Sequence, residues 1–221
     1  MPSVPTPALQ LTTAVDQLSV YLLRLGRTAR EVPASEFLSH AVSLLRELVD
    51  FNSGWWGLAT DHDKLKTPSI HQAEYLNLPA SFASEWRSIS SVDDFGQDIR
   101  NNVGQVQRFA IDETGGIPHV LANFDLLYEL HHGMGLVLDD ASTGHAFFIV
   151  LYRGAHDLPF SDDEAVLFLH LLRHTIQLWH HSLQDALSTA SAEGISRAAL
   201  ARLNGRLVYA GPELCELLFA L

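Results

Sequence analysis

Histidines at helical spacing are the first residues in this sequence with an evident chemistry. His170, His174 and His181 follow one another at intervals of four and seven residues, so they share one face of a helix. Two histidines four residues apart on a helix can hold zinc. No glutamate completes the HExxH pattern of zinc proteases. The alternative is that these histidines form a polar edge of the helix that faces solvent or a dimer partner. We favour the polar edge and predict no metal site.

Three other histidines allow a similar choice. His71 stands beside Gln72 and near Glu74 in an expected strand, where it could orient a ligand or bind haem. A surface histidine is the alternative for this position. His131 and His132 precede a glycine, and we interpret them as part of a turn rather than as a ligand pair.

Covalent catalysis is not indicated. Cys215 is the one cysteine of the sequence, and it has no basic neighbour that would activate a thiolate. The sequence contains no GxSxG, no P-loop, no cysteine cluster and no GxGxxG. We therefore expect that the chain is not an enzyme.

Aromatic residues offer a different kind of site. Trp55 and Trp56 are neighbours in an expected strand and so point to opposite faces, one into the core and one along the far face. An aromatic cavity of the usual ligand-binding kind is the hypothesis for one face, with plain core packing as the alternative for each residue. The predicted ligand-binding residues are Trp56, His71, Phe95, Phe109, Phe124 and Tyr128. The ligand and any cofactor stay unknown.

The elements that must position these residues centre on Gly133 to Leu187. Two apolar runs joined by Asp-Asp-Ala-Ser-Thr-Gly predict an antiparallel hairpin. The second run, Phe147 to Tyr152, is continuously apolar, which favours a strand covered on both faces and central in its sheet.

A long helix follows that hairpin. Ser161 is a good N-cap, and its spacing from Glu164 fits a capping box. An apolar stripe of Ala165, Phe168, Leu172, Ile176, Trp179 and Leu183 is expected to cover the sheet. Leu167, Leu171 and Leu178 fall on a second flank of the same helix, free for another helix of this chain or of a partner.

The N-terminal segment offers an apolar face that matches this flank. Leu11, Val15, Leu18, Leu22 and Leu25 recur at heptad spacing in a helix that Gly26 and then Pro33 should end. We predict a homodimer built on these helices, with Leu18, Leu22, Leu167, Leu171 and Leu178 as its contacts. If the N-terminal helix instead packs on the flank within its own chain, the protein could be monomeric.

The segments between these helices predict a mixed fold. A helix over residues 35–51, strands at 55–59 and 69–78, a helix at 80–89, a weak strand at 105–111 and a helix at 120–130 are expected. Residues 93–102 could be helix or loop. In the helix at 120–130, Leu121, Phe124, Leu127 and Tyr128 should point inward. Beyond residue 195, a hairpin around Asn204-Gly205 and a helix over 212–219 are the opening of a further unit.

Composition excludes some partners. The 221 residues carry a net charge of −12, which argues against gripping a phosphate backbone, so we predict no specific DNA binding by this chain. The single cysteine fits a reducing compartment, and no secretory signal or membrane-spanning run is visible. We expect a cytoplasmic protein.

Three stretches carry a family resemblance: DFNSGWWGLAT (50–60), IHQAEYLNLPASFASEW (70–86) and PFSDDEAVLFLHLLRHTIQLW (159–179). With the order of elements, they resemble the GAF-like N-terminal sensory region of bacterial LuxR-type helix-turn-helix transcription regulators. The Trp, Tyr and Asp pattern of quorum-sensing LuxR sensors is not found. ALARLNGRLVYAGPELCELL (199–218) resembles the opening of a PAS domain, although Gly211 stands where an Asn is usual.

The resemblance implies an α+β fold with an antiparallel sheet flanked by helices and a long C-terminal helix. The predicted organisation is a tail and helix at 1–34, a GAF-like sensory domain at 35–187, and a linker with the start of a PAS-like unit at 188–221. The implied function is a small-molecule-binding and dimerisation module, with DNA bound only through a domain absent from this chain. The alternative is a ligand-free protein-interaction scaffold of the same fold.

Overall fold

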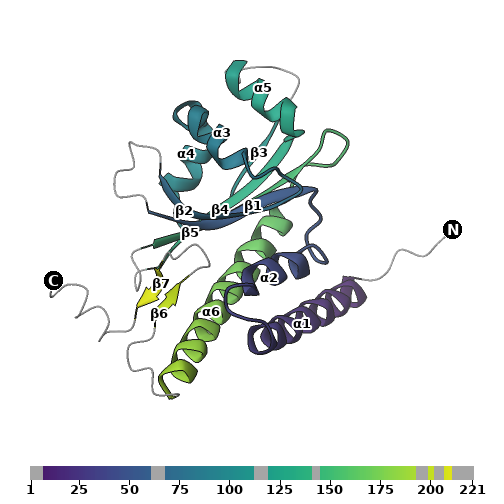
Figure 1. Cartoon of the computed structure of the whole chain (residues 1–221). Helices are drawn as coiled ribbons and strands as arrows, with labels where there is room; N and C mark the ends of the chain where they lie inside the picture. Colours follow the sequence, from purple (N-terminus) through teal and green to yellow (C-terminus); the bar gives the residue numbers. More distant parts are fainter. Residues whose placement is uncertain are drawn as a thin grey trace, which may run out of the picture. The chain divides into compact units, whose positions relative to one another are not determined.

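A five-stranded antiparallel sheet organises residues 49–170, one of the two compact units of the chain (Figure 1). Residues 1–48 and 171–221 form the other unit. The computed structural model describes residues 7–60, 68–111, 119–140, 145–192, 199–201 and 207–210.

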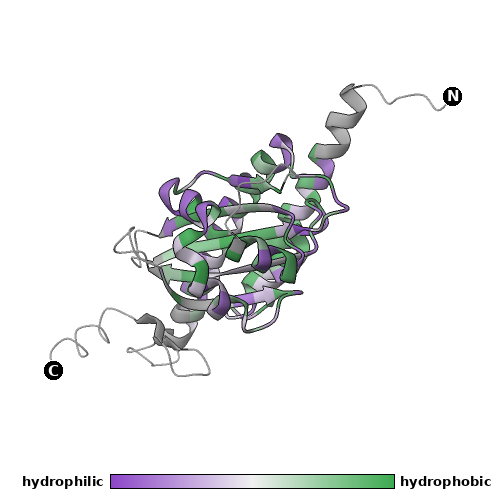
Figure 2. Ribbon diagram, turned by 90° about the horizontal axis from the view of Figure 1, so that it is seen from above, coloured by the Kyte–Doolittle hydropathy of each residue, from purple (hydrophilic) through white to green (hydrophobic). Residues whose placement is uncertain are grey.

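The strand order of the sheet is β2-β1-β5-β4-β3. The strands are β1 (Ser53–Thr60), β2 (Ser69–Leu76), β3 (Gln107–Ala110), β4 (His132–Asp140) and β5 (His145–Arg153). β5 pairs with β1 on one side and with β4 on the other, so the continuously apolar strand is central, as its sequence predicts. Green, hydrophobic residues gather in the middle of the sheet in the hydropathy colouring of Figure 2.

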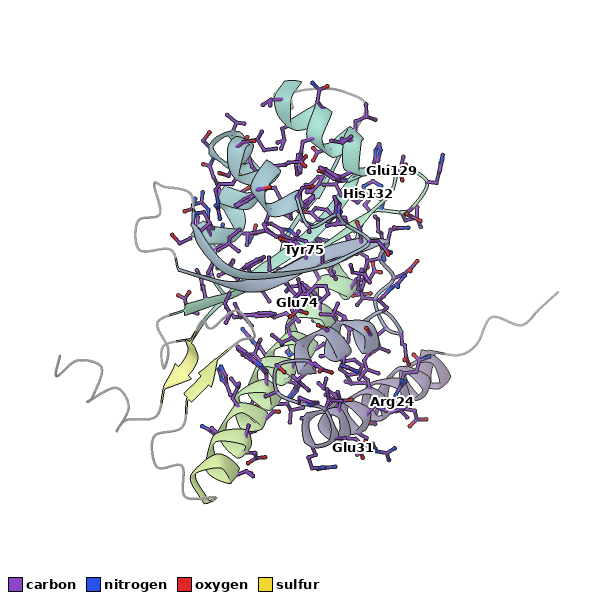
Figure 3. The ribbon with its side chains drawn as sticks, viewed as in Figure 1. Arg24, Glu31, Glu74, Tyr75, Glu129 and His132 are labelled. Atoms are coloured by element: carbon purple, nitrogen blue, oxygen red, sulfur yellow. The ribbon has the colours of Figure 1, made fainter. Side chains whose placement is uncertain are left out.

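Helices from the middle of the chain lie over one face of this sheet (Figure 1). They are α3 (Phe82–Ile89), the short 3₁₀ helix η1 (Ser90–Val92), α4 (Asp94–Asn101) and α5 (His119–Tyr128). Alternation along the strands turns every second side chain toward them. On β2, Tyr75 faces the helices, whereas Glu74 points to the other side (Figure 3). The buried cluster between helices and sheet includes Trp55, Phe82, Trp86, Ile99, Phe124, Phe148, Val150 and Tyr152.

The stretch 93–102, which the sequence left open between helix and loop, contains the helix α4. Two local predictions need revision. Leu127, predicted to point inward from α5, is 67% exposed. His132 is the first residue of β4 rather than part of a turn; it is buried, and its Nε2 lies 3.0 Å from the Asp157 carbonyl oxygen. The hydrogen bonds of β4 explain the last difference, because they extend the strand to the residue before Gly133.

The start of α6 (Asp162–Ala192) follows the predicted capping box. The Glu164 backbone N–H donates to the Ser161 hydroxyl at 3.2 Å, and the Ser161 N–H donates to Glu164 Oε2 at 2.8 Å. Arg153, at the end of β5, is buried and pairs with the same glutamate at 2.5 Å while donating to the Asp50 and Leu158 carbonyls. This ion pair and its hydrogen bonds outweigh desolvation and hold the pKa of Glu164 below its usual value.

The other unit contains α1 (Pro7–Glu31), α2 (Phe37–Leu45) and the later turns of α6. Leu25 and Phe37 are fully buried, and the Trp179 indole of α6 donates to the Ala34 carbonyl at 3.3 Å. α1 runs past Gly26, which the sequence analysis expected to end it, because a glycine lowers helix propensity by only about 1 kcal/mol. α2 is shorter than the predicted helix over 35–51.

The leucines proposed for a dimer differ in exposure. Leu171 is fully buried, so it packs within its own chain and offers no surface to a partner. Leu18 and Leu22 on α1, and Leu167 and Leu178 on α6, are half-buried. The dimer therefore stays a prediction that rests on these four residues.

Two further features complete the described fold. β6 (Ala199–Ala201) and β7 (Leu207–Ala210) form the predicted antiparallel hairpin, whose Asn204-Gly205 turn lies outside the described residues, as do the helix over 212–219 and Cys215. The PAS resemblance stays a prediction. None of the helices in the described ranges is long and apolar enough to cross a membrane. These elements confirm the predicted α+β class: an antiparallel sheet flanked by helices, with a long C-terminal helix.

Candidate ligand-binding site

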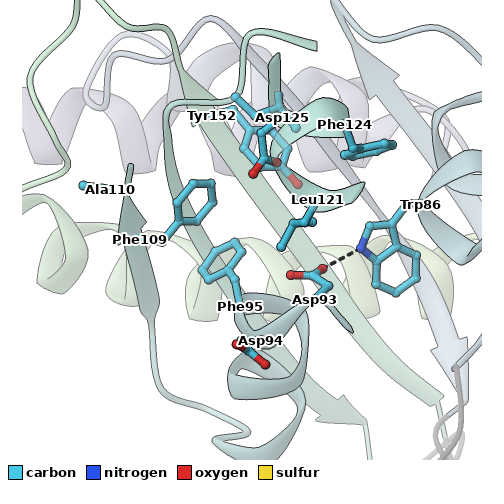
Figure 4. A pocket seen from close by; sticks show the side chains of 11 residues that line it. Trp86, Asp93, Asp94, Phe95, Phe109, Ala110, Leu121, Phe124, Asp125 and Tyr152 are labelled. Carbon is cyan, nitrogen blue, oxygen red and sulfur yellow. Dashed lines mark hydrogen bonds between the residues drawn. The ribbon is translucent and has the colours of Figure 1, made fainter. Parts of the chain in front are cut away.

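A pocket of about 210 Å³ lies between the sheet and the helices that cover it (Figure 4). This volume is below the roughly 300–1,000 Å³ that is usual for ligand pockets, so an occupant must be small. The residues that line it are Trp86, Asp93, Asp94, Phe95, Phe109, Ala110, Leu121, Phe124, Asp125, Leu130 and Tyr152. Aromatic rings and carboxylates thus dominate the walls.

Contacts between aromatic rings build the apolar walls. Phe95 of α4 packs on Phe109 of β3 with ring centroids 4.7 Å apart, and Phe124 of α5 packs on Phe82 of α3 at 5.1 Å. Phe109 lies directly over its partner Gly133 on β4, where an added Cβ would meet the ring at 2.2 Å. The missing side chain of this glycine is what allows the ring to lie against the sheet.

Asp93 ends the stretch after α3 and caps the N-terminus of α4. Its Oδ1 accepts a hydrogen bond from the Gly96 backbone N–H at 3.0 Å, and its Oδ2 accepts one from the Trp86 indole at 2.7 Å. The side chain is buried. Asp93 therefore fixes the orientation of Trp86 while presenting a carboxylate to the pocket (Figure 4).

Asp125 is placed by the way α5 ends. Glu129 adopts a left-handed conformation with φ of +57°, the Leu130 N–H donates to the Asp125 carbonyl at 2.8 Å, and the Glu129 N–H donates to the Leu126 carbonyl at 3.4 Å. This is a Schellman motif, in which the last turn closes tightly. The turn places Asp125 and the buried Leu130 on the same pocket wall.

The Asp125 carboxylate is the unusual group of the site. The residue is 7% exposed and faces the pocket (Figure 4), and no hydrogen-bond donor of the described residues reaches its carboxylate. Burial, together with the negative charge of Asp93, raises the pKa of Asp125 to about 7. Tyr152 of β5 lies beside it, and burial and the charges of both aspartates raise the pKa of its phenol as well.

The arrangement can recognise a molecule but offers little for covalent chemistry. Two carboxylates and a phenol provide acceptors and a donor within an aromatic cavity, and none of the described residues lining the pocket is a cation. No group of three His, Cys, Asp or Glu side chains within the described ranges is arranged to hold a metal ion. His170, His174 and His181 are all exposed.

The pocket contains half of the predicted ligand-binding residues. Phe95, Phe109 and Phe124 line it together, and their contact with a ligand stays a prediction. Tyr128 lies next to it: the ring packs on Phe82 and Phe124, and the hydroxyl donates to Glu85 at 2.5 Å. The side chain of His71, in β2, lies outside the described part of the structure.

Of the two tryptophans of β1, Trp55 and not the predicted Trp56 lies on the pocket side of the sheet. Trp55 faces the helices and packs on Trp86 and Phe148, with ring centroids 5.2 Å and 4.8 Å away. Strand alternation turns Trp56 to the other face of the sheet, away from the pocket side. The prediction that Trp56 lines the cavity is corrected accordingly.

Sequence reasoning missed the polar groups of the pocket. Asp125 follows Leu121 by four residues and so shares its inward face of α5, which was a readable signal. Asp93 stands directly before α4, where aspartate is a preferred cap. No signal in the sequence predicts that Trp86 and Asp93 are hydrogen-bonded.

Comparisons with known proteins show which solved structures have a similar fold. No family model matches the sequence, and no curated protein matches it. The N-acylhomoserine-lactone-dependent LuxR family transcription factor CepR2 from Burkholderia cenocepacia has a TM-score of 0.54 at 14% identity, over 76% of this chain and 96% of that one. SdiA from Escherichia coli has a TM-score of 0.54 at 17% identity, over 75% of this chain and 68% of that one.

A structure of SdiA in complex with octanoyl-rac-glycerol gives a TM-score of 0.54 at 15% identity, over 74% of this chain and 66% of that one. At identities this low, the similarity shows a shared arrangement of helices and strands and nothing about function. The chain thus has the fold found in a LuxR-family transcription factor, in agreement with the resemblance inferred from its sequence.

Proposed function

We propose that this chain is the small-molecule-binding sensory module of a cytoplasmic transcription regulator. The observation that carries the proposal is the pocket of about 210 Å³, walled by aromatic rings and containing the buried carboxylate of Asp125, which has no hydrogen-bond partner among the described residues. Buried polar groups without partners are costly, and they are retained where a ligand supplies the missing contact. The fold shared with a lactone-dependent transcription factor supports the same role.

The proposed role is regulatory and not enzymatic. Solved structures that share the fold include those of a transcription factor and of SdiA, one of them in complex with a small molecule. A net charge of −12 disfavours contact of this chain with a phosphate backbone, so the proposal assigns DNA contact to another domain of the regulator.

Homodimerisation through the helices is part of the proposal. On α1, Leu18 and Leu22 border the buried face that contains Tyr21 and Leu25, and Val15 beside them is 53% exposed. A strip of this kind on a helix suits a two-fold contact with a second copy. Leu171, being buried, takes no part.

A thermal-shift screen with matched variants tests ligand binding. Leu121 lines the pocket, and Leu126 lies on the same helix but is 70% exposed. Compounds that fit the pocket should raise the melting temperature of the wild type and of Leu126→Trp, but not of Leu121→Trp, in which the indole occupies the space. Compounds that stabilise Leu121→Trp as much as the wild type bind elsewhere and would contradict the assignment.

The ligand-free scaffold remains the second candidate, favoured by the ring contacts that already fill much of this face of the sheet. It predicts that no compound raises the melting temperature of the wild type. It also predicts that Leu121→Trp keeps every protein contact of the wild type, because the pocket would have no role in them.

A further inference from the structure

The charge of the pocket is one-sided. Asp93 and Asp125 lie in its walls, Asp94 lies at the exposed rim, and no Lys, Arg or His belongs to the described lining. Acidic side chains alone do not make a site, but Asp125 adds a separate observation. It is more than nine-tenths buried, faces the pocket, and has no hydrogen-bond donor within the described structure.

The ring walls select among the groups that could satisfy this carboxylate. Phe95, Phe109, Phe124 and Tyr152 surround the space, and the faces of aromatic rings attract cations through their quadrupole. A metal ion would need several oxygen ligands in a fixed geometry, which two carboxylates among phenylalanines do not provide. An anion would be repelled by both aspartates.

We propose that the pocket binds a small organic cation, a primary or substituted ammonium group on an apolar body, with Asp125 and Asp93 facing the ammonium. This inference rests on the proposed sensory function and adds the chemical class of its ligand. The ammonium N–H groups would supply the donors that Asp125 lacks, while the apolar body would lie against Phe95 and Phe109.

Asp93 and Asp125 have unequal roles in this arrangement. The Asp93 carboxylate already accepts hydrogen bonds from Gly96 and Trp86, so it contributes charge and positions the indole. Asp125 is free to contact the ligand. The groups that face it are Asp93, before α4, and Tyr152, on β5. Both carboxylates favour a bound cation, so binding should strengthen as Asp125 ionises.

Isothermal titration calorimetry of the full chain with three probes of similar shape and different charge tests the proposal. They are phenethylamine, phenethyl alcohol and phenylacetate. At about pH 8, where Asp125 with its pKa of about 7 is ionised, phenethylamine should bind at least about tenfold more tightly than the alcohol, and phenylacetate should not bind. Asp125→Asn should remove most of that preference.

Asp98→Asn is the matched control, because Asp98 is exposed on α4 and does not line the pocket. This variant loses the same charge and should bind phenethylamine within about twofold of the wild type. Circular dichroism establishes that both variants are folded.

Three results would overturn the proposal. If phenethyl alcohol binds as tightly as phenethylamine, or Asp125→Asn binds the amine no less tightly than Asp98→Asn, the pocket is a site for neutral molecules, and the sensory function stands without the cation. If folded wild type binds none of the probes up to ~10 mM, the organic-cation assignment fails, and the thermal-shift screen decides on the sensory function separately.

Discussion

Replacing Asp125 with asparagine should stabilise the ligand-free protein, and the gain should grow with pH. Burial and the charge of Asp93 raise the pKa of Asp125 from 3.8 to about 7 in the folded state. Between about pH 4 and about pH 7, the folded protein therefore holds a proton that the unfolded chain has released. Stability conferred at this position falls as pH rises through that window, and asparagine, which does not titrate, is free of this loss.

The magnitude follows from the size of the pKa shift. One unit corresponds to about 1.4 kcal/mol, and about two units of the shift fall between pH 5 and pH 7. Water that enters the pocket screens part of this electrostatic free energy. We therefore expect the stability difference between Asp125→Asn and wild type to increase by about 2 kcal/mol from about pH 5 to about pH 8.

Urea unfolding at the two pH values measures this directly, because the difference between variants cancels the titration of the other groups. Asp98→Asn, an exposed carboxylate on α4, is the control and should differ from wild type by the same amount at both pH values, within about 0.5 kcal/mol. If the Asp125→Asn difference does not change with pH, or if the variant is the less stable protein at pH 8, the account of this pocket as a costly, unpaired charge is refuted.

Other substitutions test the surrounding framework. Arg153→Met removes the buried partner of a half-exposed glutamate and three hydrogen-bond donors, and should lower the free energy of unfolding by about 3 kcal/mol in urea; a loss below about 1 kcal/mol would mean that the ion pair contributes little. Glu129→Gly relieves the left-handed backbone that ends α5 and should raise stability by about 1 kcal/mol; destabilisation in the same assay would contradict the strain. Leu22→Glu should yield a folded monomer in size-exclusion chromatography, whereas Leu23→Glu, on the exposed side of the same helix, should elute as the wild type does; a monomeric wild type would refute the dimer.

Local signals predicted the frame of the fold well. The continuously apolar Phe147–Tyr152 run could only be buried on both faces, and it occupies the central strand. Ser161 and Glu164 form the capping box because their spacing brings each side chain to the other's backbone N–H. These features depend on residues close in sequence, which is why the sequence alone could predict them.

The polar content of the pocket depends on residues far apart in sequence and was not predicted. The spacing of Asp125 from Leu121 places it on the inward face of α5, but only the packing of the folded chain shows that its carboxylate is buried at a pocket. Trp55 and Trp56 are equivalent in pattern, and only the pairing of β1 with its neighbours decides which one meets the helices. Leu171 was assigned to a free flank of α6 for the same reason. The residue is buried by contacts with distant parts of the chain, which the helical periodicity of α6 alone does not reveal.

The most direct test of the central claim, that a small molecule binds beneath α3, α4 and α5, uses indole signals in a ¹H–¹⁵N spectrum. The chain has four tryptophans. The Trp86 indole N–H donates to Asp93 at the pocket wall, whereas that of Trp179 donates to Ala34 in the other unit. A Trp86→Phe variant assigns the reporting signal.

Titration with phenethylamine, or with phenethyl alcohol if the ligand is neutral, should move the Trp86 signal in a saturable way and leave the Trp179 signal in place. Saturable movement by the amine alone would support both the pocket and its preference for cations. A Trp86 signal that stays fixed with every probe, or that moves no more than that of Trp179, would contradict the claim that this pocket is a ligand-binding site.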